Sequence, residues 1–327
     1  MSAKLSLEAA RALADEILFP TANEIDAMAV LPRARLDLLA DHGWYGLSAP
    51  ASGLELADGW PILEAFAGGC LTTTFVWMQH LGTPPACAFG PEHLRPWVDS
   101  LATGERRSTV VFAGLLPEPP LLAREDGDDW ILHGSAPWVS GWGLTDVIHV
   151  AARTPDDDVV WLLVDAACDG LHATPLRLFA VNASATVTLR FEEVRVEAAC
   201  QTSRFPWREW PARDAMGLRT NGSLALGIAA RCCRLIGPSP LDEQLEARRV
   251  ALDNGTAETL PAARAAAAAF SVQAASALVT KEGSECVVAG SHAERLLRET
   301  GLLLVFGSRP SIRRQLLAKL GASANRE

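Results

Sequence analysis

The 327-residue sequence predicts an α+β multidomain protein, with an N-terminal helical bundle over residues 1–107, a central β barrel or sandwich over 108–203 and a C-terminal helical bundle over 204–327. Two observations predict this order. Helix formers with apolar periodicity fill the first part and return after about Asp214. Between them lie short runs rich in Val, Thr and Trp, separated by turns that contain Asp and Gly. Contiguous, segregated segments of each kind are typical of separate layers or domains.

The composition is that of an ordinary globular protein, with 49% hydrophobic and 21% charged residues. The net charge of -10 and the lack of a basic cluster argue against a nucleic-acid partner, because phosphate neutralisation requires grouped Lys and Arg. The N-terminus mixes charged and apolar residues, which predicts an amphipathic helix rather than a signal peptide. Because no apolar run is long enough, we expect no membrane span. Seven cysteines without a CxxC pair predict reduced thiols, no metal site and a cytoplasmic location.

Local features define some of the expected helices. Ser6 is a candidate N-cap for the first helix, and residues 61–80 are apolar enough to form one long buried helix. Residues 262–279 have few polar side chains, Arg264 among them, and a helix that is apolar all round must be buried on most sides. This predicts association of the chain as a dimer or tetramer. Three histidines in apolar or strand surroundings are predicted to be structural: His80, His133 and His149.

Five short phrases along the chain resemble stretches of the acyl-CoA dehydrogenase family, in the same order and domain context. They are 39–50 (LADHGWYGLSAP), 97–105 (WVDSLATGE), 134–141 (GSAPWVSG), 191–196 (FEEVRV) and 306–314 (FGSRPSIRR). The resemblance implies the three-part fold above, FAD as cofactor, and an acyl thioester of CoA or a carrier protein as substrate. It also implies a homo- or hetero-oligomer.

The central phrase supplies the expected cofactor contacts. By the resemblance, Trp138 forms an aromatic wall for the flavin ring, and Ser140 supplies a hydroxyl two residues on, on the same strand face. Ala113 and Gly114 begin a reduced form of the family's "TEPxxGSD" phrase and are expected near the flavin. The alternative is that Trp138 is a core aromatic and that Ser140 caps a turn.

The sequence departs from the family at the catalytic base. Removal of the α-proton of a thioester requires a carboxylate. The two positions where family members carry this glutamate match Gly307 and, within a residue or two, Gly217. The nearest carboxylate is Asp214, which is either the base or an N-terminal helix cap. For Glu299, an ion pair with Arg295 and Arg298 is the simpler account.

The segments that meet the FAD phosphates in the family are also reduced. Arg234, in the stretch 234–237 (RLIG), stands for the family's "RxxFG" loop, and Gly290 lies in the remnant of its "GGxG" segment. Loss of an arginine and a Gly-rich cradle costs affinity for a dinucleotide with two phosphates, so we expect FAD to be weakly held or lost.

Three functions remain open from the sequence. The first is FAD-dependent oxidation of the Cα–Cβ bond of an acyl thioester. The second is a non-catalytic partner subunit of a heteromeric acyl-CoA dehydrogenase, which lacks its own base. The third is a flavin-dependent monooxygenase or oxidase on the same scaffold.

Overall fold

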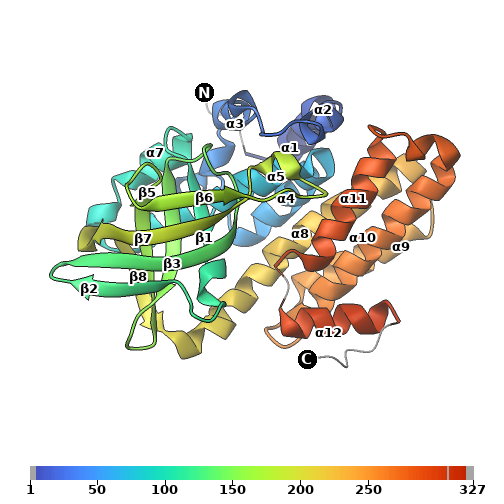
Figure 1. Ribbon diagram of the computed structural model, residues 1–327. Helices are drawn as coiled ribbons and strands as arrows, with labels where there is room; N and C mark the ends of the chain where they lie inside the picture. The colour runs from blue at the N-terminus through green and yellow to red at the C-terminus, as the bar shows by residue number, and fades with distance from the viewer. Residues whose placement is uncertain (1–4, 308, 322–327) are drawn as a thin grey trace.

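The computed structural model describes residues 5–307 and 309–321, apart from the side chain of Met216. The outer ends of the predicted first and last domains, 1–4 and 322–327, lie outside the described residues. The helices of the N-terminal part, which lie together in Figure 1, are α1 (Leu7–Leu13), η1 (Ala14–Leu18), α2 (Ala22–Asp26), α3 (Arg33–Asp41), η2 (Trp44–Gly46), η3 (Pro50–Ser52), α4 (Leu56–Gly69), α5 (Leu71–Trp77), η4 (Met78–His80), α6 (Thr83–Phe89), η5 (Glu92–Leu94) and α7 (Trp97–Thr103). The predicted cap is confirmed, because the Ser6 hydroxyl accepts a hydrogen bond from the Ala9 N–H at 3.2 Å.

The single long helix predicted over 61–80 is wrong. The helix is interrupted at Cys70, whose backbone is extended (φ -149°). Helix α4 therefore ends at Gly69, and α5 starts at Leu71. Two successive glycines, Gly68 and Gly69, weaken the helix at this point because glycine has a low helix propensity. The apolar pattern continues through the break, since residues on both sides of it are buried.

The strands of the central part are β1 (Ser108–Val111), β2 (Leu122–Asp126), β3 (Asp129–Val139), β4 (Val147–Arg153), β5 (Asp158–Asp165), β6 (Leu171–Pro175), β7 (Val187–Glu197) and β8 (Gln201–Pro206), with the short turns η6 (Ala113–Leu115), η7 (Asn182–Ser184) and η8 (Ala198–Cys200). Of the described residues, these eight strands form one mixed sheet in the order β6-β7-β3-β2-β4-β5-β8, and β1 pairs with β4. The β1–β4 pair is parallel and most other pairs are antiparallel. The predicted fold class, with strands between two sets of helices, is confirmed.

The C-terminal part consists of η9 (Trp207–Glu209), α8 (Trp210–Ile236), α9 (Leu241–Asp253), α10 (Leu260–Glu282), η10 (Gly283–Val287), α11 (His292–Val305) and α12 (Pro310–Lys319). The apolar helix α10 packs against α8, α9, α11 and α12 (Figure 1). Among the described residues, only the stretch Leu260–Val287 is long and apolar enough to cross a membrane, and 56% of its most apolar window is buried inside the fold. The chain itself therefore covers much of this helix, and association of chains stays a prediction.

Arg264 on α10 is a buried arginine. Only 2% of the residue is exposed, and its Nη2 donates to the Leu303 carbonyl oxygen at 3.1 Å. That carbonyl belongs to the last turn of α11, where backbone acceptors lack helical partners. Burial lowers the pKa of Arg264 to about 10. The guanidinium thus binds the C-terminal end of α11 and links it to α10.

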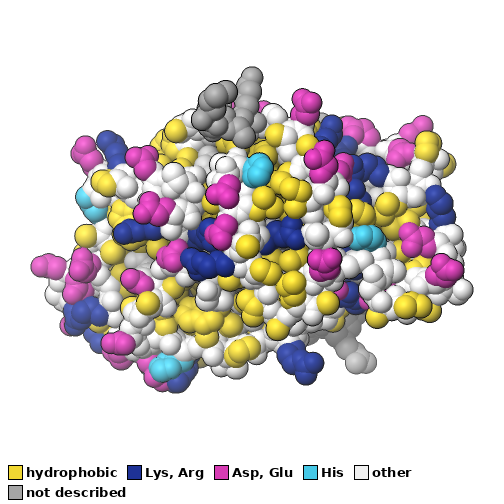
Figure 2. Space-filling view, turned by 90° about the horizontal axis from the view of Figure 1, so that it is seen from above, with side chains coloured by type: hydrophobic (Ala, Val, Ile, Leu, Met, Phe, Trp, Pro, Cys, Tyr) yellow, Lys and Arg dark blue, Asp and Glu magenta, His cyan; other side chains and the backbone are white. Residues whose placement is uncertain are grey.

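Charges on the surface are mixed in sign. On the face seen in Figure 2, acidic and basic side chains are interspersed among hydrophobic ones, apart from what the grey atoms cover. Elsewhere among the described residues, charges pair across elements, as Arg298 does with Asp26. The face in Figure 2 therefore has no field of a single sign that would attract a polyanion.

Helices α4 and α8 cross at unusually close range. A Cβ atom on Gly68 would lie 2.7 Å from the carbonyl oxygen of Gly227, and one on Gly227 would lie 2.9 Å from the Ala67 Cβ and even nearer to the Glu64 carbonyl oxygen. Real Cβ atoms do not approach backbone atoms so closely, so both positions require glycine. This crossing fixes the N-terminal helices against the C-terminal bundle.

We predict that Gly227→Ala destabilises the protein by about 1–3 kcal/mol, as overpacking of a filled core does. Gly217 is the matched control on the same helix, because a Cβ there meets no described atom within 4 Å outside its own helical segment. Gly217→Ala should be neutral or stabilise by up to about 1 kcal/mol through helix propensity. Urea denaturation of both variants measures the free energy of unfolding. Equal stability of the two variants would contradict the conclusion that Gly227 has no room for a side chain.

His80 joins the N-terminal helices to the sheet as a neutral imidazole. Its Nδ1 accepts a hydrogen bond from the Ser108 N–H at 3.0 Å, so Nε2 carries the proton and donates to the Leu101 carbonyl oxygen at 3.0 Å. Complete burial lowers the pKa of His80 to about 3. The prediction that His80 is structural is confirmed, whereas His133 is exposed and pairs with Glu193.

We predict that His80 makes folding less favourable as pH falls. The unfolded chain takes up a proton near pH 6.5, whereas the folded chain does not until about pH 3, so stability declines between these values. One such group contributes at most about 1.4 kcal/mol per pH unit. His80→Gln keeps a donor and an acceptor without titrating. Urea midpoints at about pH 7.5, 6 and 5, which span the ordinary pKa of histidine, should therefore fall less steeply in the variant. Parallel declines would refute the prediction.

Candidate functional site

The two glycines that match the family's base positions lie near one another. Gly307 follows α11 with a left-handed backbone (φ 61°), and a Cβ there would lie 3.1 Å from Asn221 Nδ2. Asn221 is one helical turn beyond Gly217 on α8, so these two residues share a helix face. The space beside Gly217 is open among the described residues. The structure therefore has room for a side chain at this place, and neither glycine supplies a carboxylate.

Asp214 is held in an ion pair. Its two carboxylate oxygens accept from Nε and Nη2 of Arg309, which precedes α12, and both side chains are mostly buried. The Arg309 guanidinium also lies over the Phe112 ring, 5.9 Å from its centroid. The alternative that Asp214 caps the helix is wrong, because α8 begins at Trp210 and Asp214 lies inside its second turn.

This pairing changes what the Asp214 carboxylate can do. A carboxylate whose two oxygens both accept guanidinium hydrogen bonds has neither oxygen free to approach a substrate. To reach a substrate carbon, Asp214 would also have to leave Arg309 behind in a mostly buried setting. The geometry gives Asp214 a structural partner, and its role as a base stays a prediction.

Trp138 is exposed to solvent. It lies near the end of β3 with a left-handed backbone (φ 63°), and 64% of its side chain area is exposed. The alternative of a core aromatic is therefore wrong. A bulky residue with positive φ is strained, and such strain gathers at functional positions. An exposed indole can serve as a flat wall for the flavin ring, and this role of Trp138 stays a prediction.

Ser140 does not share a face with Trp138, contrary to expectation. It lies just after β3, is 3% exposed, and its hydroxyl bonds to Thr186 Oγ1 at 2.8 Å. The physical reason is an irregularity in the β3–β7 register between Ala136 and Val139, which breaks the two-residue alternation of strand side chains. The Ser140 hydroxyl is thus engaged inside the sheet.

Ala113 and Gly114 lie in η6, just after β1. The Gly114 carbonyl oxygen accepts from the Leu121 N–H at 2.8 Å, and a Cβ at Gly114 would lie 2.9 Å from the Leu121 Cβ. Close packing inside the sheet therefore explains this glycine. Ala113 is partly exposed, and its cofactor contact stays a prediction.

The residues matched to the phosphate-binding segments are engaged within the chain. Both terminal nitrogens of Arg234 donate to Asp15, at 2.9 and 3.1 Å, and the Gly290 carbonyl oxygen accepts from Asn23 Nδ2 at 2.6 Å. FAD needs an aromatic wall, donors at the ring edge and cations at its phosphates. Trp138 offers the wall, but the Ser140 hydroxyl and the terminal nitrogens of Arg234 are already bonded within the chain. These residues do not fit FAD in this single chain.

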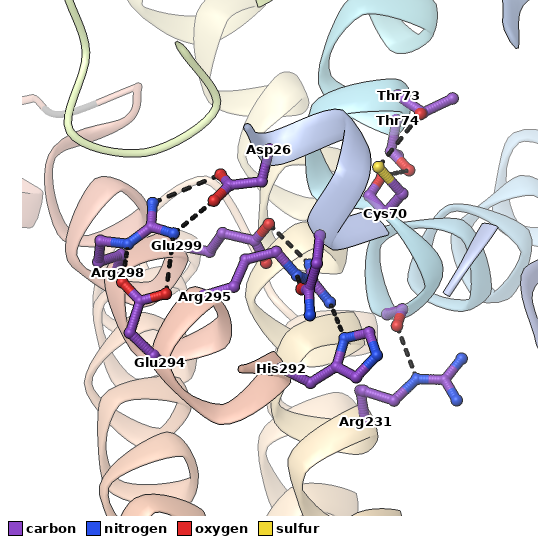
Figure 3. Close-up of polar contacts among 12 residues, drawn as sticks. Asp26, Cys70, Thr73, Thr74, Arg231, His292, Glu294, Arg295, Arg298 and Glu299 are labelled. Atoms are coloured by element: carbon purple, nitrogen blue, oxygen red, sulfur yellow. Dashed lines mark hydrogen bonds and ion pairs between the residues drawn. The ribbon is translucent and has the colours of Figure 1, made fainter. Parts of the chain in front are cut away.

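A buried polar cluster joins α11 to the N-terminal helices (Figure 3). The predicted Glu299–Arg295 pair is confirmed at 2.9 Å, with both side chains 1% exposed. Arg298 does not share it, because Arg298 pairs with Glu294 and Asp26 instead. Each buried charge thus has an internal partner, as a desolvated ion requires.

A cavity of about 580 Å³ lies at the end of the sheet where β1 and β4 begin. Two indoles, one cation and two carboxylates are among the groups that line it: Trp97, Trp142, Arg106, Asp146 and Asp165. The cation stacks on the first indole at 4.5 Å. Sequence reasoning missed this cavity, because no motif joins residues so far apart in the chain.

Comparisons with known proteins agree with this fold. Residues 2–105 match the family model described as acyl-CoA dehydrogenase, N-terminal domain. The chain is 30% identical over 170 residues to 3-sulfinopropanoyl-CoA desulfinase of Variovorax paradoxus, covering 48% of this chain and 43% of that protein. It is 25% identical over 207 residues to mitochondrial short-chain specific acyl-CoA dehydrogenase of Bos taurus, covering 57% and 49%. The chain spans about half the length of these curated relatives.

Among solved structures, the fold matches a glutaryl-coenzyme A dehydrogenase in complex with glutaryl-CoA. The TM-score is 0.81 at 17% identity, over 98% of this chain and 96% of that one. At this identity the likeness concerns the fold.

We predict that Trp138→Gly leaves stability within about 1 kcal/mol of the wild type. Relief of left-handed strain, about 1–2 kcal/mol, offsets the entropy cost of glycine, and an exposed indole loses little packing. A core tryptophan would instead lose about 3–5 kcal/mol on truncation. Thermal denaturation distinguishes the two, and a loss in the larger range would show that the indole serves the fold.

Proposed function

Because this chain belongs to the acyl-CoA dehydrogenase family, we propose that it binds an acyl thioester but does not dehydrogenate it alone, as the non-catalytic subunit of an assembly whose partner carries the base. The general reaction of the family is FAD-dependent oxidation of an acyl-CoA. The proposal rests on one observation. Both positions matched to the base are glycine, and the nearest carboxylate is paired with Arg309.

Dehydrogenation between Cα and Cβ requires a group that accepts the α-proton, and loss of a general base typically slows a reaction about 10²–10⁴-fold. Arg309 and Asp214 form a neutral pair, so the site supplies neither a free carboxylate nor an uncompensated cation from that pair. A bound thioester would keep its α-proton.

The name of one relative supports a function other than dehydrogenation. The protein of Variovorax paradoxus is named a desulfinase of 3-sulfinopropanoyl-CoA, so the name of a related chain specifies a reaction other than dehydrogenation. Oxidation of the Cα–Cβ bond by this chain itself is the competing candidate. Its specific support is the exposed Trp138, which could face a flavin ring.

We predict that the wild-type chain binds butyryl-CoA in calorimetry but does not exchange its α-protons in D₂O faster than buffer does. Exchange, followed by NMR, reports the base without requiring a cofactor. Gly217→Glu fits the open space and should raise exchange by about tenfold or more. Gly217→Gln is the matched control of the same shape without the carboxylate, and it should stay at the buffer rate.

Two results would contradict the proposal. Wild-type exchange that disappears in Asp214→Asn would identify Asp214 as a working base. Absence of any butyryl-CoA binding would remove the thioester from the proposal, whatever the exchange rate of the variants.

A further inference from the structure

We propose that Asp15 is an internal anion that fills a two-arginine site formed by Arg231 and Arg234, and that the chain therefore does not hold the phosphates of FAD through these residues. The proposal is independent of the catalytic base. It concerns the contact between η1 and the last turns of α8, where Arg234 stands at the position matched to the family's "RxxFG" loop.

The geometry at Asp15 is that of a bound oxyanion. Oδ1 accepts from Arg231 Nη2 at 2.5 Å and from Arg234 Nη2 at 3.1 Å, and Oδ2 accepts from Arg234 Nη1 at 2.9 Å. Two guanidinium groups one helical turn apart thus converge on one carboxylate. Arginine forks of this kind suit carboxylate and phosphate equally.

Arg231 needs an anion because it is buried. Its side chain is 7% exposed, its Nε donates to the Gly68 carbonyl oxygen at 2.6 Å, and its guanidinium lies 4.1 Å from the Phe19 ring centroid. Arg295 is a further positive group near Arg231 in Figure 3, whereas burial and the neighbouring arginines lower the pKa of His292 to about 4 and leave that ring uncharged at neutral pH. A desolvated cation among other cations requires a counter-charge from somewhere.

Asp15 supplies that charge in its ionised form. Burial raises the pKa of Asp15, but hydrogen bonds from Arg234 and Arg231 outweigh burial and hold it below its usual value. The carboxylate is therefore charged at neutral pH and balances one of the two arginine charges. An external phosphate that bound both guanidinium groups in the same way would have to displace it.

A second contact joins the same N-terminal stretch to the other matched segment. Asn23, on α2, donates through Nδ2 to the Gly290 carbonyl oxygen and accepts through Oδ1 from Arg295 Nε at 2.8 Å. Gly290 lies in the segment matched to the family's Gly-rich cradle. The same N-terminal stretch thus contacts both of the segments that the sequence matches to the cofactor phosphates.

The first test removes the internal anion. Asp15→Asn should lower Tm, and about 10 mM inorganic pyrophosphate should restore about 3 °C or more of the loss while moving wild type by less than about 1 °C. Asp26→Asn is the matched control, because Arg298 keeps Glu294 as its second carboxylate. This variant should show no pyrophosphate rescue. Equal responses of all three proteins would overturn the proposal.

The second test does not depend on the Asp15 variant folding. FAD is titrated into wild-type chain and into Arg234→Gln, with flavin fluorescence as the readout. The proposal expects either no binding or the same affinity in both. Stoichiometric FAD on the wild type that weakens about tenfold or more in Arg234→Gln would overturn it. Neither test uses an acyl thioester, so failure here is distinguishable from failure of the proposed function.

Discussion

The close crossing of α4 and α8 is the constraint on which the other arrangements depend. With glycine at Gly68 and Gly227, the two helix backbones come within a distance that any side chain would prevent. Contact at this range brings buried polar groups of the two helices together. Glu64 on α4, which is 7% exposed, accepts from Arg219 on α8 at 3.3 Å and from Arg249 on α9 at 3.0 Å. The N-terminal helices and the C-terminal bundle thus share one core.

The position of α8 then determines the candidate site. Its C-terminal turns present Arg231 and Arg234 to Asp15, while its N-terminal turns present Asp214 and Gly217 beside Arg309 and Gly307. Trp210, at the first residue of the helix, packs near Phe112 at the end of β1, with ring centroids 5.8 Å apart. One helix of 27 residues therefore connects the sheet, the matched base positions and the two-arginine site.

Local patterns predicted the fold because they depend on neighbours in the chain. Helical periodicity, strand-rich runs with turns, the Ser6 cap and the Glu299–Arg295 pair all involve residues a few positions apart. The apolar pattern of 61–80 did not reveal the break at Cys70, because buried residues continue on both sides of it. Nor could the sequence show that a bulge in β3 turns Ser140 inward.

The candidate site was harder to predict because its decisive contacts are long-range. Asp214 lies 95 residues from Arg309, and Asp15 lies 216 residues from Arg231, so no spacing rule joins either pair. The family resemblance predicted which positions correspond to the base and to the phosphate segments. It could not say that carboxylates from the same chain would occupy the arginines.

An internal carboxylate has an advantage over a soluble anion that does not depend on better contacts. Asp15 is held by the chain, so its effective concentration at Arg231 and Arg234 is in the millimolar range or above, and its binding costs no loss of translational freedom. A phosphate with similar hydrogen bonds must exceed this concentration to displace it. The same reasoning applies at the other end of α8. A glutamate at Gly217 would place a second negative charge about one helical turn from Asp214. With glycine there, the Asp214–Arg309 pair is balanced, so the absence of the base and the presence of the pair are physically consistent with each other.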